Sequence, residues 1–199
     1  MNTLEAIRTR KSVRHFTANP VTAEMIENVL LAGVEAPSTK NSQPWKYYVV
    51  QGKAKDKLAE LMNEGLHFFG NEQTLPHLPF YASVVGSIQT MQSAPVVILV
   101  FNTGIHTMNS DGSLEARFMD CAAMQTMGAT IQNMLLAATD QGLGSLWMCD
   151  VYYAYEQICS WLGEQSQLAA AIALGHEDGN SPKPPRHNLR DHTIYFEDN

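Results

Sequence analysis

The chain contains 199 residues, a length that suits a single domain with a sizeable hydrophobic core. Its hydrophobic fraction of 45% and charged fraction of 17% are those of an ordinary globular protein and exclude a disordered chain. The formal net charge of −7 argues against a general nucleic-acid binder and against a polybasic membrane binder.

We expect one domain over residues 1–199, located in the cytoplasm. The longest apolar run, residues 95–101, is far too short to span a bilayer, and the N-terminus shows no apolar segment of a secretion signal. Cys121, Cys149 and Cys159 have neither metal-binding nor redox-motif spacing. Reduced thiols are therefore the simplest interpretation.

Three helices and two strands are predicted along the first half of the chain. Asn2 or Thr3 can cap a first helix. A second helix should run from residue 22 to residue 36, because Pro37 disfavours helical conformation in the residue before it. The hydrophobic pattern then predicts a strand over 46–51, a helix over 54–62 and a buried strand over 95–102.

A long helix is predicted over residues 115–141, with apolar side chains on nearly all of its sides. Such a helix must be surrounded by protein, either in the core or along a subunit interface. The remaining elements are a strand over 145–149, a helix over 153–162, a strand over 168–174 and a last edge strand over 193–196. This order indicates an α+β sandwich around one sheet.

Several common catalytic motifs are missing. Gly142 and Gly144 form a G-x-G, but Trp147 stands where the third glycine of a dinucleotide-binding fingerprint belongs. The sequence has no Walker A motif, no H-E-x-x-H and no G-x-S-x-G. Its seven histidines show no ligand spacing, so no metal site is expected.

A basic cluster follows the first helix. Arg8, Arg10, Lys11 and Arg14 outweigh Glu5, so residues 1–14 carry +3 and the remainder of the chain carries −10. One interpretation is a solvated helix end, where cations complement the helix dipole. The other is a phosphate clamp, because guanidinium groups match phosphate oxygens with two hydrogen bonds.

Three loops also combine turn residues with polar groups. Residues 36–45 suit a capped turn before a strand, but the amides of Asn41 and Gln43 could also read a planar heterocycle. Residues 141–147 suit a helix end and a turn, and they free backbone N–H groups for a ring. Residues 175–186 form a proline-rich loop whose cations are either solvated or folded back onto the basic cluster.

Taken in this order, the four segments resemble the nitroreductase family of FMN enzymes. The resemblance rests on R-x-R-K-S-V-R, P-S-x-x-N-x-Q-P-W, the helix and turn ending in Q-G-L-G-S-L-W, and P-K-P-P-R. It implies an α+β sandwich with a central sheet flanked by helices, a long buried core helix and a homodimer. The Gly-Tyr-Pro common in relatives is replaced by Gly175-His176-Glu177, and residues 64–92, which line or cover the substrate pocket in relatives, carry no family signature.

The resemblance also implies which residues contact FMN. One group would hold the phosphate, ribityl chain and ring within one subunit: Arg10, Lys11, Ser12, Arg14, Gly144, Ser145, Leu146 and Arg186. A second group would approach the flavin bound mainly by the other subunit: Pro37, Ser38, Thr39, Asn41 and Gln43.

The implied activity is an oxidoreductase that takes hydride from NAD(P)H onto FMN N5 and passes it to nitroaromatic, quinone or similar small acceptors by a ping-pong mechanism. The flavin carries the chemistry, so no catalytic side chain is expected. Arg14 is the candidate cation near flavin N1 and O2. The alternatives are reductive dehalogenation or oxygen-dependent flavin breakdown on the same scaffold, and a non-catalytic FMN-binding protein.

Overall fold

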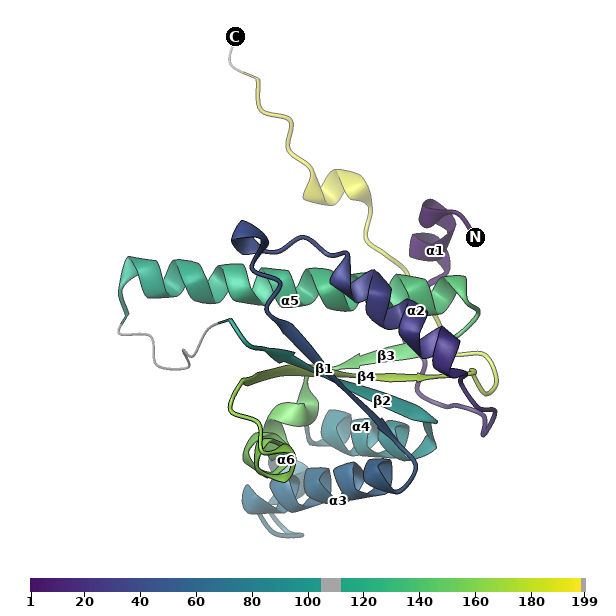
Figure 1. Cartoon of the computed structure of the whole chain (residues 1–199), viewed down its shortest axis with the longest axis vertical. Helices are drawn as coiled ribbons and strands as arrows, with labels where there is room; N and C mark the ends of the chain where they lie inside the picture. Colours follow the sequence, from purple (N-terminus) through teal and green to yellow (C-terminus); the bar gives the residue numbers. More distant parts are fainter. Residues whose placement is uncertain (105–111, 198–199) are drawn as a thin grey trace.

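A four-stranded antiparallel sheet with strand order β1-β2-β4-β3 forms the centre of the molecule (Figure 1). The computed structural model describes residues 1–104 and 112–197. The strands are β1 (Trp45–Gln51), β2 (Val96–Asn102), β3 (Gly144–Met148) and β4 (Gln167–Gly175). All four were predicted to within one or two residues of their ends.

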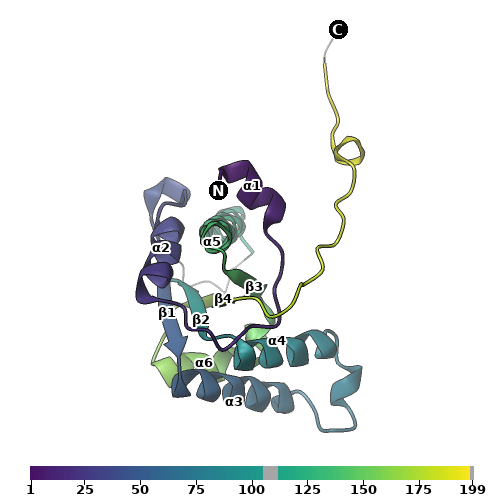
Figure 2. The same ribbon diagram turned by 90° about the vertical axis from the view of Figure 1, so that its right-hand side faces the viewer.

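Helices cover both faces of the sheet, as the two ribbon views show (Figures 1 and 2). One layer contains α1 (Thr3–Thr9), α2 (Ala23–Val34) and α5 (Leu114–Asp140). The other contains α3 (Lys53–Phe68), α4 (Tyr81–Ser93) and α6 (Tyr155–Leu162). The α+β sandwich expected from the sequence is confirmed. Among the described residues, no helix combines the length and hydropathy needed to cross a membrane.

Strand β2 explains why the sandwich has two cores. All of its residues are buried, and successive side chains point to opposite faces of the sheet. Val97, Leu99 and Phe101 pack against the layer of α3, α4 and α6. The alternate residues Val96, Ile98 and Val100 pack against α2 and α5. The continuous β-branched sequence is thus that of a strand covered on both sides.

Helix α5 is buried on one side only within a single chain. Met134 and Ala138, in its C-terminal half, are fully buried, whereas Leu114, Phe118 and Met124 are exposed. The neighbouring helices α1 and α2 also expose apolar side chains: Leu4, Ile7, Leu31 and Val34. The predicted all-round apolar helix therefore contributes to the core and leaves an apolar outer surface.

Helix α4 was missed by the sequence interpretation, which left residues 64–92 largely unassigned. Val84, Ile88 and Met91 are buried at helical spacing, so a signal was present in the sequence. Phe68 and Phe80 are 81% and 74% exposed. Their rings therefore do not pack beneath a helix within one chain.

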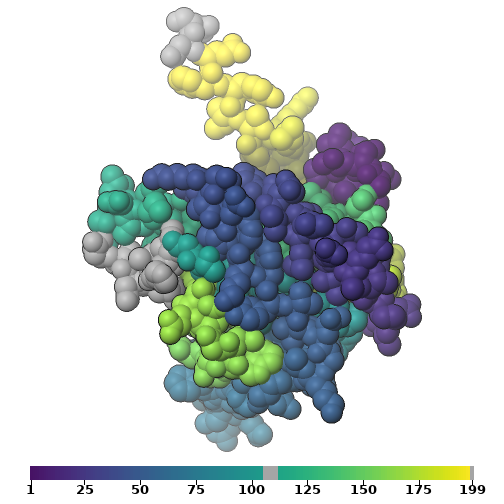
Figure 3. Space-filling view, viewed as in Figure 1, coloured from purple at the N-terminus to yellow at the C-terminus, as the bar shows by residue number. Residues whose placement is uncertain are grey.

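The predicted edge strand over residues 193–196 is wrong. The chain after β4 forms an extended segment with one short 3₁₀ turn, Leu189–His192. Ile194, Tyr195 and Phe196 are 84–92% exposed, and the segment stands clear of the body in the space-filling view (Figure 3). β-Branched and aromatic residues favour strands only where a sheet edge is available for pairing, and this segment points away from the sheet.

Glu164 joins the end of the α6 region to strand β1. Its carboxylate accepts hydrogen bonds from Lys46 Nζ at 2.6 Å and Tyr48 OH at 2.7 Å, and from the backbone N–H groups of Gln165 and Ser166 at 2.9 Å each. The Lys46 ammonium, the Tyr48 hydroxyl and the Ser166 N–H hold the pKa of Glu164 well below its ordinary range.

The substitution Glu164→Gln is expected to destabilise the fold by about 1–3 kcal/mol, because it removes a charged acceptor from several donors. The melting temperature at pH 7 should fall by roughly 2–10 °C. Because the pKa of Glu164 is lower in the folded protein, its carboxylate stabilises the fold at pH values above the unfolded-state pKa of about 4.3. This contribution to stability is lost progressively as the pH falls below that value. The difference between the two proteins should therefore shrink at pH 3. Thermal melts at both pH values are the measurement, with exposed Glu72→Gln as control, and a pH-independent difference would contradict the ionic explanation.

Candidate flavin site

The basic segment after α1 lies against the start of β3. Ser12 forms a parallel bridge with Ser145, and Val13 N donates to Ser145 O at 3.0 Å. A Cβ atom at Gly144 would lie 2.9 Å from three side-chain carbons of Val13, so only glycine permits this approach. The structure thus brings residues 10–14 and 144–146, two of the four predicted segments, to one place.

The loop after β4 completes this cluster. Phe16 bridges Glu177, and the backbone N–H groups of Thr17 and Asp178 donate to His176 O and His15 O, at 2.9 Å each. The end of β4 therefore runs beside the basic segment, and three of the four predicted segments meet.

Lys11 is held by the protein itself. Its ammonium lies 3.0 Å from Glu177 Oε2 and donates to Asn180 Oδ1 at 2.8 Å. Glu177 and Asn180 were not identified from the sequence, because their partner lies more than 160 positions away and no local pattern marks such a contact. Lys11 was expected to contact the cofactor directly, but in this structure its charge is shared with Glu177.

The two arginines of the cluster are less engaged. Arg10 is half-buried and Arg14 is exposed, and neither forms an ion pair within the described residues. The backbone carbonyl of Arg14 accepts a hydrogen bond from Thr90 Oγ1 of α4 at 3.3 Å. Thr90, which the sequence interpretation missed, thereby fixes the segment from the opposite layer. The guanidinium groups remain available for an anionic ligand.

Within the described residues, Arg186 takes no part in the contacts that hold this cluster together. Lys183 Nζ donates to Arg8 O, so the loop does fold back onto the end of α1. Three residues later Arg186 is exposed, and within residues 1–104 and 112–197 no hydrogen bond or ion pair joins it to the basic segment. Its predicted role as a phosphate ligand stays a prediction.

Ser145 provides a direct test of whether a ligand fits this place. Its residue is 2% exposed, and among the described residues its hydroxyl has no hydrogen-bond partner. A buried hydroxyl without a partner costs free energy on the order of 1–3 kcal/mol. A polar ligand beside the guanidinium groups would supply that partner, so the donor set fits a phosphate-bearing group.

The loop over residues 37–43 has a strained backbone. Lys40, Asn41 and Gln43 adopt φ angles of 54°, 55° and 45°, in the left-handed region that non-glycine residues rarely occupy. Ser38 Oγ accepts from Gln43 N at 3.0 Å, and Thr126 Oγ1 of α5 accepts from Thr39 N at 3.4 Å. Strain maintained in this way is typical of a segment that positions groups for a ligand.

This loop does not reach the basic cluster within one chain. It contacts α5 at Thr126, whereas β3 begins after the end of α5 at Asp140. The two positions are 14 residues apart on the helix, about 21 Å along its axis. Pro37, Asn41 and Gln43 are exposed, as expected for groups that serve a different chain.

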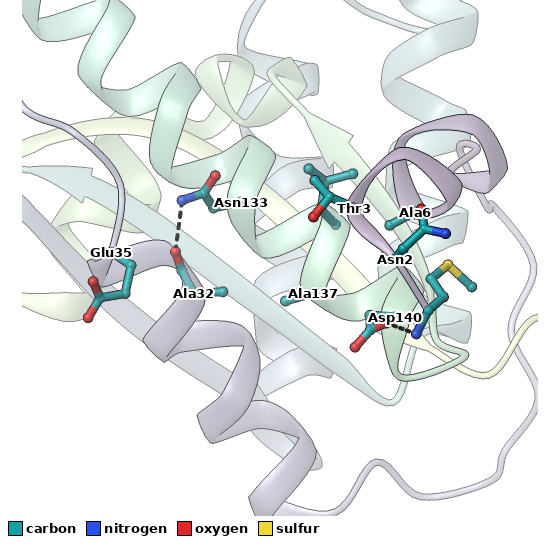
Figure 4. A pocket seen from close by; sticks show the side chains of 10 residues that line it. Asn2, Thr3, Ala6, Ala32, Glu35, Asn133, Ala137 and Asp140 are labelled. Atoms are coloured by element: carbon teal, nitrogen blue, oxygen red, sulfur yellow. Dashed lines mark hydrogen bonds and ion pairs between the residues drawn. The ribbon is translucent and has the colours of Figure 1, made fainter.

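A groove of about 340 Å³ lies elsewhere, between α1, α2 and α5 (Figure 4). Asn133 Nδ2 donates across it to Ala32 O at 3.1 Å, and the amino group of Met1 pairs with Asp140. The carboxylates of Glu35 and Asp140 line this groove, which makes it unsuitable for a phosphate. It is a feature of the apolar outer layer rather than of the cluster.

No group of three or more His, Cys, Asp or Glu side chains arranged to hold a metal ion occurs among the described residues. One of the seven histidines, His106, lies outside them. The candidate site is therefore the cluster formed by residues 10–14, the start of β3 and the loop after β4.

Residues 7–176 match the model of the nitroreductase family. This chain belongs to the nitroreductase family. It is 25% identical over 208 residues to nitrobenzene nitroreductase from Ectopseudomonas oleovorans, covering 90% of this chain and 88% of the relative.

Two solved structures resemble this nitroreductase-family chain. A Desulfovibrio desulfuricans protein in complex with FMN is 27% identical, with a TM-score of 0.72 and coverage of 99% and 98%. The FMN-dependent nitroreductase NfnB from Mycobacterium smegmatis, in complex with NADPH, is 23% identical, with a TM-score of 0.75 and coverage of 98% of each chain. At 23% identity, the similarity to NfnB shows a shared fold alone.

Proposed function

We propose that this family member is an FMN-dependent NAD(P)H oxidoreductase that reduces nitroaromatic, quinone or similar small acceptors. The observation that carries the proposal is the convergence of the basic segment and the β3 start around the Ser145 hydroxyl, which has no hydrogen-bond partner among the described residues. The family match and the FMN complex of a 27% identical protein support it. We place the enzyme in the cytoplasm, where its three free cysteines stay reduced.

Arg10 would bind the FMN phosphate, because charge-assisted hydrogen bonds to phosphate are strong and directional, and Arg14 would contact the flavin ring edge. Ser12 and Ser145 would add hydroxyl donors, and the backbone around Gly144 and Leu146 would face the flavin ring. Lys11 would act with Glu177 to hold the segment in position. Arg186 would add a further cation to the phosphate site.

When bound, FMN supplies the redox chemistry by accepting hydride at N5 from NAD(P)H and passing two electrons to the acceptor. Arg14 would favour reduction by placing positive charge beside the ring edge that becomes anionic. Both substrates would use one open face in alternation, which makes ping-pong kinetics the expected mechanism. The absence of a dinucleotide-binding fingerprint fits a nicotinamide co-substrate that binds transiently and dissociates in each turnover.

The enzyme would be a homodimer with two composite sites. The apolar outer surface of α1, α2 and α5 is incompletely covered in one chain, and the strained loop with Asn41 and Gln43 lies too far from its own basic cluster. Pairing two such surfaces would cover the helices and bring each loop to the partner's flavin. An obligate interface of this type buries more than about 2,000 Å².

The purified protein is expected to show the absorption bands of a bound flavin and to oxidise NADH or NADPH when nitrobenzene or a quinone is added. Double-reciprocal plots at several acceptor concentrations should be parallel. Intersecting lines would reject the shared face. A colourless protein that fails to bind added FMN would overturn the proposed function.

A further inference from the structure

A small pocket lies beneath the strained loop, between it and the N-terminal half of α5. It has a volume of about 110 Å³. Met119, Ala122 and Ala123 of α5 form an apolar wall, and Thr39, Lys40 and Ser42 of the loop form a polar side. Because an engineered apolar cavity of about 150 Å³ accepts benzene, a pocket of this kind suits part of one aromatic ring.

The fixed polar groups of this pocket already have partners. Asn102 is fully buried, its Oδ1 accepts from Gly104 N at 3.1 Å and its Nδ2 donates to Gln167 at 3.1 Å. Thr126 Oγ1 donates to Ala122 O at 2.9 Å and accepts from Thr39 N. These groups hold the walls in place and do not require a ligand.

Lys40 is different. It is the charged member of the described pocket lining, and no aspartate or glutamate occurs among these described residues. Within the described residues, no carboxylate forms an ion pair with its ammonium. The left-handed φ of 54° fixes the Lys40 backbone in the loop that would face the partner's flavin. In a chain of net charge −7, Lys40 places a positive charge at this pocket.

We propose that Lys40 makes the enzyme select small aromatic acceptors that carry an anionic substituent, such as a carboxylate. The apolar wall would contact the ring, and the ammonium would pair with the anion. This inference rests on the proposed function, since it places the pocket beside the flavin of the other subunit. Without Lys40 the overall negative charge of the protein would disfavour an anionic acceptor.

The test compares 4-nitrobenzoate with its uncharged analogue 4-nitrobenzamide in the FMN-loaded enzyme. The ratio of their kcat/KM values is expected to fall about five- to tenfold in Lys40→Met, the range between an exposed ion pair and a charged hydrogen bond. Lys40→Arg should preserve the ratio. Lys53→Met, which removes the same charge from α3 on the opposite layer, should leave it unchanged. An unchanged ratio in Lys40→Met would overturn the proposal.

Calorimetric binding of benzoate and benzamide to the same proteins separates this inference from the proposed function. Benzoate should bind more tightly than benzamide, and Lys40→Met should abolish the preference. If that result appears without any acceptor turnover, the pocket is correct and the reductase assignment is wrong. If turnover is normal but benzoate shows no Lys40-dependent preference, the reductase assignment stands and the anionic pocket is rejected.

Discussion

Replacing Arg10 or Arg14 with alanine is expected to weaken FMN binding by about ten- to a hundredfold in each case, because a charge-assisted hydrogen bond contributes about 1.5–3 kcal/mol. Both residues flank Ser12, which the structure fixes beside Ser145, and neither is neutralised by an ion pair within the described residues. Fluorescence titration of FMN into the apoprotein is the measurement.

Arg8→Ala is the matched control for both substitutions. Arg8 carries the same charge in the last turn of α1, and its backbone carbonyl rather than its side chain binds Lys183. An equal loss of affinity in this variant would mean that the cluster acts through general attraction alone. Unchanged affinity in both Arg10→Ala and Arg14→Ala would dismiss the role of the basic segment in binding FMN.

The substitution Leu31→Glu should dissociate the proposed dimer and reduce FMN affinity at least tenfold. Leu31 is 54% exposed on α2, within the apolar outer layer, and a buried carboxylate at a subunit interface is strongly unfavourable. If each site needs the partner's loop, the variant should show both the molar mass of a monomer and a weakened affinity for FMN. Light scattering combined with FMN titration measures both.

Phe68→Glu is the control for this experiment, since it places the same charge on an 81% exposed apolar position of the opposite layer. It should remain dimeric. A Leu31→Glu variant that is monomeric yet binds FMN normally would show that each site is complete within one chain. A variant that stays dimeric would place the interface elsewhere.

The architecture was largely predictable because it depends on local patterns. The β-branched run of β2 and the long apolar pattern of α5 specify elements that only a two-sided sandwich can cover. Helix α4 was overlooked, although Val84, Ile88 and Met91 carry its spacing. Residues 193–196 have strand propensity without a partner, and propensity alone misled the prediction.

The site was less predictable because its decisive features are not local. The pairing of Lys11 with Asn180 joins residues 169 positions apart, and no spacing rule anticipates it. The left-handed backbone at Lys40 and Gln43 occurs in residue types that normally avoid it, so only the folded loop reveals the strain. Motif order located the right segments but not the side chains that organise them.

The Ser145 hydroxyl, which has no hydrogen-bond partner in the described part of the chain, also links the proposed cofactor to the lifetime of the protein in the cell. A ligand at a concentration of 100 times its Kd stabilises a fold by about 2.7 kcal/mol. Here it would also give the buried Ser145 hydroxyl a hydrogen-bond partner. The flavin-free chain would open more often and expose more of itself to proteases. In the proposed enzyme, cellular flavin supply would therefore govern how much of this protein accumulates, independently of how fast each molecule turns over.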